Sequence, residues 1–265
     1  MKFKLILLSF NILIVLSFLI VFLLPFFILG ADYSADYWHN SWYLSIGFVL
    51  VIGLINSVYF INKKLLVCLE NEDWQGLKNL LDNYIFEKNK YKGIYIKLYI
   101  NASIATSSIN DIKRLEARLR ESAPSKVSAF ALPLGMPYLL EGEPVAMKNF
   151  YGEFISVKTD YSGWIKWNYC FALLLLKETE EAVSILTGLV TPQKDKLLKL
   201  SSLYMLSPFS SDSEVGEIIT NEKAALASSM TRTLFTKEVD KQRENVQMLF
   251  LSKILNEALD WLYST

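Results

Sequence analysis

The residues that most often carry out chemistry are scarce in this chain of 265 residues. It has one histidine, His39, and two cysteines, Cys68 and Cys170, which lie far apart and belong to no CxxC pair. Zinc sites and histidine-based acid–base catalysis need more ligands than this, so both cysteines are expected to be small buried apolar residues. The chain also lacks a GxxxxGK[ST] loop, a GxGxxG motif that opens a helix and an HExxH motif. We therefore expect no enzymatic activity, no metal and no cofactor.

Charge is balanced over the whole chain. There are 27 Lys and Arg residues against 27 Asp and Glu residues. One basic group, Lys88, Lys90, Lys92 and Lys97, has two interpretations: a solvated turn, or a contact with anionic lipid headgroups. Nucleic-acid binding needs a concentrated positive patch, so nucleic acid is not expected as a partner.

Aromatic side chains gather between residues 150 and 170. Four of them are candidates for binding a partner protein, because Trp and Tyr dominate the energetic centres of interfaces. The alternative is that they fill the core between two helical hairpins. The four candidates are Tyr151, Phe154, Trp164 and Trp167.

Two long apolar segments begin the chain. Leu5–Ala31 and approximately Ser41–Ile61 contain no charged residue. A helix of about 20 apolar residues is long enough to cross the hydrocarbon core of a bilayer. Only the segment Asp32–Asn40 separates them, so we expect a transmembrane helical hairpin over residues 1–62, closed by a short loop. The second helix is expected to continue through Leu69 and to pair with a helix at Trp74–Tyr84.

The flanking charges predict how this hairpin is oriented. Lys2 and Lys4 precede the first span and Lys63 and Lys64 follow the second, while the segment between them has no Lys or Arg. The bias of Lys and Arg toward the cytoplasmic side places both termini in the cytoplasm and the protein in the cytoplasmic (inner) membrane. Aromatic residues near the outer edge suit the interfacial belt of such a span: Tyr33, Tyr37, Trp38, Trp42 and Tyr43. A cleaved signal peptide is the alternative for the first span, although its apolar stretch exceeds the usual length.

Asn11 and Asn56 are polar residues inside the two spans. Asn11 lies seven residues after Lys4, and Asn56 lies seven residues before Lys63. In an antiparallel hairpin these positions have similar depth, so the two amides are expected to hydrogen-bond, at roughly 0.6 to 2 kcal/mol. The alternative is a polar site for a transported solute or a partner helix.

Residues 63–265 are expected to be helical throughout, with a repeat of about 35 residues. The pattern of Asp73, Trp74, Leu77 and Leu81 returns 38 residues later as Asp111, Ile112, Leu115 and Leu119, and Ala146 precedes Ala182 by 36. Further helices are expected between these segments, so that helices alternate in pairs. An irregular helical bundle is the alternative. The other expected helices are residues 92–106, 125–140, 163–177 and 194–207.

One unit of this repeat resembles the tetratricopeptide repeat (TPR) family. Its residues are Leu134-Gly135-x-x-Tyr138-x-x-x-Gly142, followed by Ala146-x-x-x-Phe150, and Lys177–Pro192 is similar to the second helix of another unit. The unit departs from the family by one missing residue before Ala146. It also carries Pro133 and Pro137 in its first helix, where each costs roughly 3 kcal/mol unless the helix starts late or kinks. The resemblance implies an α-solenoid whose concave face binds a helix or an extended peptide.

The C-terminal part is expected to end in a long helix. After a loop at Ser207–Ser213 and a helix at Glu214–Leu234, apolar residues recur at helical spacing over Thr236–Tyr263. Such a helix would cap the last apolar face of a solenoid, or would serve as a coiled-coil partner.

The sequence thus predicts an all-α protein: a transmembrane helical hairpin (1–62) followed by a TPR-like α-solenoid (63–265) with a long capping helix. The expected function is a membrane-anchored scaffold or adaptor that binds other proteins and touches membrane lipid, as an accessory component of a larger envelope complex. The alternative is a structural subunit of a transporter or membrane-enzyme complex, packed through its hairpin.

Overall fold

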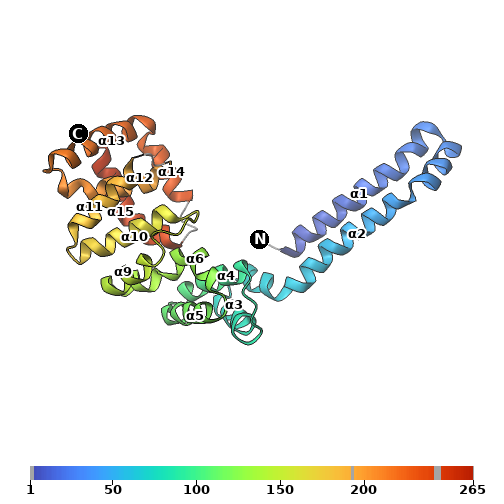
Figure 1. Cartoon of the computed structure of the whole chain (residues 1–265). Coiled ribbons are helices and arrows are strands. Elements are labelled where there is room, and N and C mark those ends of the chain that lie inside the picture. Colours follow the sequence, from blue (N-terminus) through green and yellow to red (C-terminus); the bar gives the residue numbers. More distant parts are fainter. Residues whose placement is uncertain (1–2, 192–193, 242–245, 265) are drawn as a thin grey trace. The chain divides into compact units, whose positions relative to one another are not determined.

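All regular elements of the computed structural model are helices, within the residues that it describes: 3–191, 194–241 and 246–264 (Figure 1). The side chains of residues 29, 31, 33, 213 and 246–250 lie outside that description, and so does that part of the aromatic belt at Tyr33. The chain divides into two units, residues 1–83 and 84–265.

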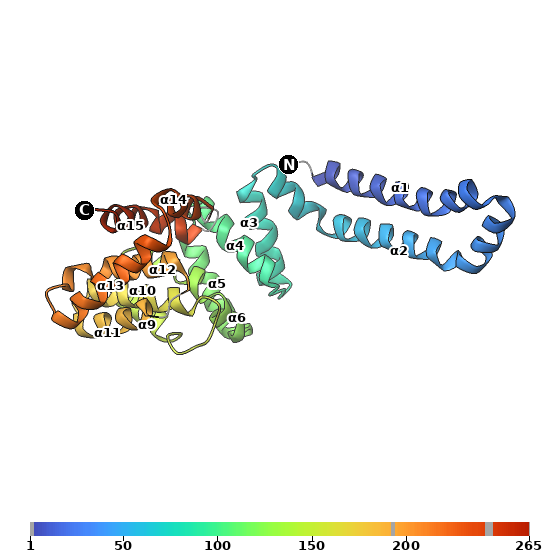
Figure 2. The same cartoon turned by 90° about the horizontal axis from the view of Figure 1, so that it is seen from above.

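The first unit is dominated by two long helices, α1 (Phe3–Leu29) and α2 (Ala31–Glu70). They run side by side in opposite directions (Figures 1 and 2). Both are long and apolar enough to span a membrane, over Phe3–Ile28 and Ser34–Glu70. Large apolar side chains point outward along both helices, for example Phe27 and Ile61, which are more than three-quarters exposed. Such a surface is suited to lipid and not to water.

The predicted loop at Asp32–Asn40 is wrong, because these residues are helical. α2 begins at Ala31, directly after Gly30, and its only non-helical residue is Ser41 (φ −119°, ψ 19°). Gly30 makes the first bend with φ 87°, a left-handed conformation that glycine adopts without a steric penalty. Ser34 then donates to the Gly30 carbonyl from both its amide (3.2 Å) and its hydroxyl (2.9 Å). Gly30 and the kink at Ser41 together reverse the chain, and the acidic and aromatic residues between them form a short helical segment.

α2 continues past Lys63 and Lys64 to Glu70, as the sequence predicts. The short α3 (Trp74–Asp82) packs against it. Asp73 caps α3 by accepting from the Gly76 amide at 2.8 Å, which is the usual role of Asp at a helix N-terminus. The predicted domain boundary after residue 62 lies inside α2.

The helix η1 (Asn83–Glu87) crosses the boundary between the units, and α4 (Gly93–Ala105) and α5 (Ile109–Ser122) follow it. Where one helix was expected over 125–140, there are three short ones: α6 (Pro124–Ala129), α7 (Ala131–Leu134) and α8 (Met136–Leu140). Each proline lacks an amide hydrogen and is incompatible with the preceding helical turn, so the chain restarts near Pro133 and Pro137.

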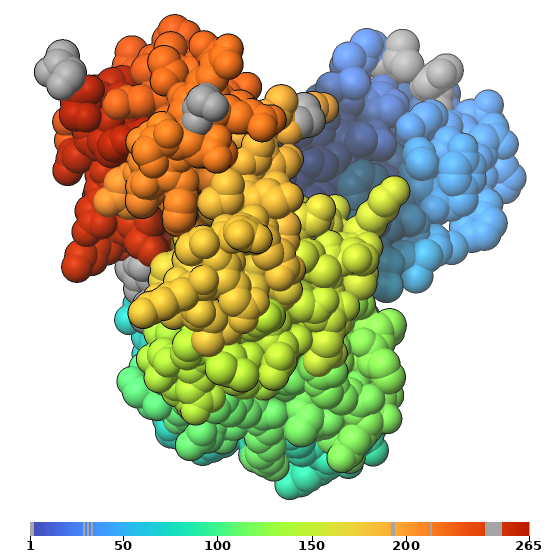
Figure 3. Space-filling model, turned by 60° about the vertical axis from the view of Figure 1, so that its left-hand side comes forward, coloured from blue at the N-terminus to red at the C-terminus, as the bar shows by residue number. Residues whose placement is uncertain are grey.

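The helices from α9 to α13 follow one another in chain order, as the succession of colours in Figure 3 shows, whereas α15 returns to α12. α10 packs against α9 and α11, and α12 packs against α11, α13 and α15. Their buried Leu, Ile, Trp and Phe side chains form the core of this unit. The elements are α9 (Pro144–Gly152), α10 (Ser162–Leu175), α11 (Thr179–Val190), α12 (Lys196–Leu206), η2 (Ser207–Phe209), α13 (Ser213–Ser229), α14 (Arg232–Lys241) and α15 (Val246–Leu262).

The predicted single helix over Thr236–Tyr263 is also wrong, because α14 and α15 run antiparallel. Arg232 forms an ion pair with Asp260, and the Tyr263 hydroxyl donates to the Met230 carbonyl at 2.5 Å. A straight helix of this length would hold such residues about 40 Å apart. The hairpin buries Phe235 of α14 as well as Leu255 of α15, which one straight helix would do less well.

Candidate partner-binding site

The structure buries all four aromatic residues that the sequence offered for partner binding. Tyr151 and Trp167 are fully buried, and Trp164 and Phe154 are 5% and 8% exposed. Tyr151 donates its hydroxyl to the Leu132 carbonyl at 3.1 Å. The assignment of these side chains to a partner surface is therefore wrong: they fill the core, because large aromatic groups at helical spacing bury more area against neighbouring helices than on an exposed face.

Trp164 has a further role as a link between elements. Its indole Nε1 donates to Asp195 Oδ2 at 2.9 Å. The other oxygen of Asp195 accepts from the amides of Leu197 (3.0 Å) and Leu198 (3.1 Å) at the start of α12. One carboxylate thus caps α12 and fastens α10 to it.

The residues of the TPR-like motif also act in packing. Gly135 lies against the ring of Tyr151, where any Cβ would overlap the ring and its hydroxyl. Tyr138 packs on Phe150 with ring centroids 5.3 Å apart. The motif therefore positions α8 on α9.

A network around a buried carboxylate joins α5 and α8 to the C-terminal end of α9. Glu116 is 6% exposed. It accepts from Arg120 Nε at 2.7 Å and from the Tyr138 hydroxyl at 2.8 Å. Arg120 also makes a bidentate pair with Glu153, at 2.8 and 3.1 Å.

This network resembles an acid–base constellation, but its groups satisfy one another. Burial and the Glu116 carboxylate raise the pKa of Tyr138, and the bond to Glu153 raises the pKa of Arg120. Both changes hold the groups in their ordinary protonated forms at neutral pH, so the network cross-links helices. The i,i+4 spacing of Glu116 and Arg120 is visible in the sequence, but the burial of Glu116 depends on α8.

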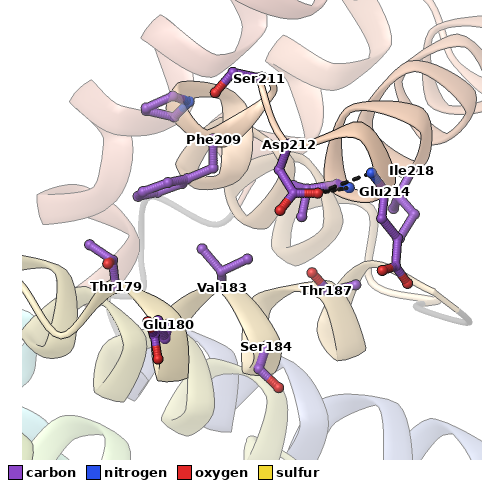
Figure 4. Close-up of a pocket in the computed structure, with 12 residues that line it drawn as sticks. Thr179, Glu180, Val183, Ser184, Thr187, Phe209, Ser211, Asp212, Glu214 and Ile218 are labelled. Atoms are coloured by element: carbon purple, nitrogen blue, oxygen red, sulfur yellow. Dashed lines mark hydrogen bonds between the residues drawn. The ribbon is translucent and has the colours of Figure 1, made fainter.

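An open groove lies between α11 and the η2–α13 turn, with a volume of about 590 Å³ (Figure 4). Val183, Phe209 and Ile218 supply apolar surface to it. Glu180, Asp212 and Glu214 supply negative charge, and among the described residues its lining contains no Lys or Arg. The other lining residues are Thr179, Ser184, Thr187, Pro208, Ser211 and Val215.

The wall of the groove formed by η2 and α13 is held rigidly. Asp212 caps α13 by accepting from the Glu214 amide at 3.0 Å (Figure 4). Gly216 lies so close to the Ser210 backbone carbonyl that a side chain would not fit. Sequence reasoning recognised only a loop here, because the groove needs two segments about 30 residues apart to meet, and no local pattern signals that.

The Asn11 and Asn56 side chains lie together in the first unit. Asn11 Nδ2 donates to Asn56 Oδ1 at 3.2 Å, and Asn56 Nδ2 donates to Asn11 Oδ1 at 3.0 Å. Asn56 also donates to the Ile52 carbonyl at 2.8 Å. Each amide therefore has a partner within the hairpin.

The remaining candidates for chemistry lie apart. His39 is exposed on α2. Cys170 is buried in α10, and burial, followed by the charge of Glu181, raises its pKa to about 12. In the part of the chain that the structure describes, no group of three or more His, Cys, Asp or Glu residues could hold a metal ion.

Comparison with known proteins identifies relatives of this chain. The family described as "Uncharacterised Treponema protein" matches residues 111–264, which is more than half of the chain. A protein of Treponema pallidum (strain Nichols), described as "Uncharacterized protein", is 24% identical over 229 residues, covering 82% of this chain and 73% of the relative. No solved structure matches the chain.

Proposed function

The chain belongs to the family described as "Uncharacterised Treponema protein", and we propose that it is a membrane-anchored adaptor that binds another protein through its helical unit. The observation that carries the proposal is the difference between the surfaces of the two units. One unit exposes apolar helices that suit lipid, and the other carries an open groove with polar and apolar walls.

The anchor is a two-pass hairpin with both termini and the helical unit in the cytoplasm. Lys4 lies at the start of α1, and Lys63 and Lys64 lie beyond the apolar part of α2. The Lys and Arg bias of short flanking segments supports this orientation.

The helical unit is proposed to work as a TPR-like scaffold. The packing of consecutive helices from α9 to α13 and the motif residues Gly135 and Tyr138 support that proposal. Stacked helix pairs offer extended grooves to helical or extended peptides.

The occupant proposed for the groove is a protein segment that carries Lys or Arg beside apolar side chains. Glu180, Asp212 and Glu214 would face its positive charges, and Phe209 and Val183 its apolar side chains. Complementary charge favours the right partner and speeds association. The proposal assigns no catalytic step to the chain.

The test is affinity capture of the full-length protein after crosslinking in intact cells. The variant Glu180→Lys with Glu214→Lys reverses the charge of the groove. The control, Asp160→Lys with Glu217→Lys, makes the same change in net charge at exposed positions outside the groove. We expect the wild type and the control to retain one stoichiometric partner and the groove variant to lose it. Equal capture by all three would contradict the groove assignment.

The second candidate function, a structural subunit packed through the hairpin, has a separate test. Because Asn11 and Asn56 satisfy each other, replacing both by Leu should weaken the hairpin and leave partner capture intact. Loss of capture from a correctly folded Asn11→Leu, Asn56→Leu variant would favour the subunit.

A further inference from the structure

A lysine-rich surface lies at the start of the second unit, outside the groove. The lysine segment (residues 88–97) joins η1 to α4 and enters that helix. It contains no acidic residue, and Lys88, Lys90, Lys92 and Lys97 are all exposed. From its charge, its fixed conformation and its exposed isoleucine we infer that this segment docks on the anionic lipid surface of the membrane in which the hairpin anchors the protein.

The four lysines differ in their partners from several other lysines of the unit. Lys113, Lys148 and Lys199 each pair with a glutamate. Among the residues that the structure describes, the lysines of the segment meet no carboxylate at ion-pair distance. Three of them lie over aromatic rings instead, with Lys88 and Lys90 over Tyr84 and Lys92 over Tyr95, at 5.4 to 5.8 Å. Their positive charge is therefore available to a negatively charged surface.

The segment is held in one conformation before any ligand arrives. The Lys90 amide donates to the Tyr84 carbonyl at 2.9 Å. Asn89, at φ 52°, accepts from the Tyr91 hydroxyl at 3.0 Å and from Arg118 Nη2 at 2.8 Å. Binding by a pre-organised segment loses little conformational entropy.

The start of α4 adds features that suit a phospholipid surface. Lys92 is the N-cap of α4, a helix of 13 residues, and makes no side-chain cap hydrogen bond; the first turn has no acidic residue. The first amides of a helix attract phosphate oxygens. Ile94 follows at once and is 56% exposed. A bilayer surface presents phosphate oxygens above an apolar layer. The helix amides beside an exposed isoleucine therefore suit a lipid surface better than nucleic acid.

The connection to the anchor is short enough for the segment to reach such a surface. Lys88 follows the last residue of α2, Glu70, by 18 residues. Because most of these are helical, they span at most on the order of 30 Å. A short connection raises the effective concentration of lipid at the segment. This step rests on the membrane anchorage that we propose above, but not on the groove.

The test uses the full-length protein in nanodiscs with an environment-sensitive fluorophore at Ile94→Cys. Cys68→Ser removes the other accessible thiol, and Cys170 is buried. Nanodiscs contain either phosphatidylcholine alone or phosphatidylcholine with phosphatidylglycerol. We expect a blue shift of the emission only with phosphatidylglycerol, reversed by high salt because salt screens the attraction. Replacing the four lysines by Gln should abolish the shift.

The matched control replaces four other exposed lysines of the second unit by Gln: Lys158, Lys177, Lys194 and Lys237. It should keep the shift. Equal emission in both nanodiscs would overturn the inference, and so would a shift that appears only when RNA is added to phosphatidylcholine nanodiscs. Partner capture by the quadruple lysine variant separates the two proposals. If this variant loses the emission shift but still captures the partner, the lysine segment binds lipid independently of the groove.

Discussion

Gly135 shows how one residue limits the packing of the helical unit. Its Cα lies against the ring of Tyr151, which is fully buried. We expect Gly135→Ala to destabilise the unit by about 1–3 kcal/mol, the usual range for overpacking a core. Chemical denaturation of the purified protein, followed by circular dichroism, measures the change.

Gly188→Ala is the matched control. Gly188 lies inside α11 and has open space around it, so alanine there should be neutral or stabilise the helix by up to about 1 kcal/mol. If the two alanine variants behave alike, the contact between Gly135 and Tyr151 does not limit packing.

Cys170 allows a pH-dependent test at the same scale. Burial raises its pKa from 9.0 to about 12, so the folded protein keeps the thiol proton at a pH where the unfolded chain releases it. This contribution to stability is complete below pH 9 and is lost as the pH rises toward 12. At pH 9 a thiolate reagent should label Cys170 rapidly in urea and far more slowly in the folded Cys68→Ser protein. Equal rates would contradict its burial.

Among elements, the link between α10 and α12 makes the clearest prediction. Asp195 caps α12 and also binds Trp164, whereas Asp212 caps α13 through backbone amides in the same way and is not bonded to a tryptophan. Loss of a cap costs about 1 kcal/mol, and loss of the second bond should add about 1 kcal/mol. We therefore expect Asp195→Ala to lower the free energy of unfolding more than Asp212→Ala.

A double-mutant cycle isolates the added term. In a Trp164→Phe background the indole donor is absent, so Asp195→Ala should cost less than it does in the wild-type protein. An unchanged cost of Asp195→Ala in that background would show that the link carries no stability.

The elements that sequence reasoning predicted are those with local causes. Apolar periodicity predicts α4, α10 and α12 to within a few residues, and uncharged length predicts α1 and α2. The matched depth of Asn11 and Asn56 predicts their contact. The turn at Gly30 was missed because Asp, Tyr and Ser are common in loops as well as in helices, and only the glycine's φ of 87° decides between them.

The features that were missed depend on contacts between distant residues. The antiparallel pairing of α14 and α15 brings together residues as distant in sequence as Arg232 and Asp260. The groove needs α11 to lie opposite η2 and the start of α13. The aromatic candidates were misassigned for the same reason. The sequence around Trp167 fits a partner-binding residue as well as a core residue, and only the packing of the neighbouring helices shows that it is buried.

At the scale of the whole molecule, the two-pass anchor should place both termini of the chain on the same side of the membrane. His39 is exposed at the end of the hairpin where the chain reverses. Lys4, Lys63 and Lys64 lie toward the other end, which we call the near end. Translocation of Lys-rich flanks is disfavoured, so the near end and the helical unit should stay in the cytoplasm. In sealed right-side-out vesicles, an impermeant maleimide should label His39→Cys but not Ser264→Cys, each in a Cys68→Ser background.

The charges themselves should control this orientation. Replacing Lys63 and Lys64 by Gln, together with Asp32→Lys and Asp36→Lys, moves positive charge to the other end of the hairpin without changing its apolar length. Because orientation follows the Lys and Arg bias of short flanks, this variant should let a fraction of Ser264→Cys react from outside. Labelling of Ser264→Cys in the otherwise unaltered chain would show that the topology is inverted. The groove, its partner and the lysine segment would then lie on the opposite side of the membrane.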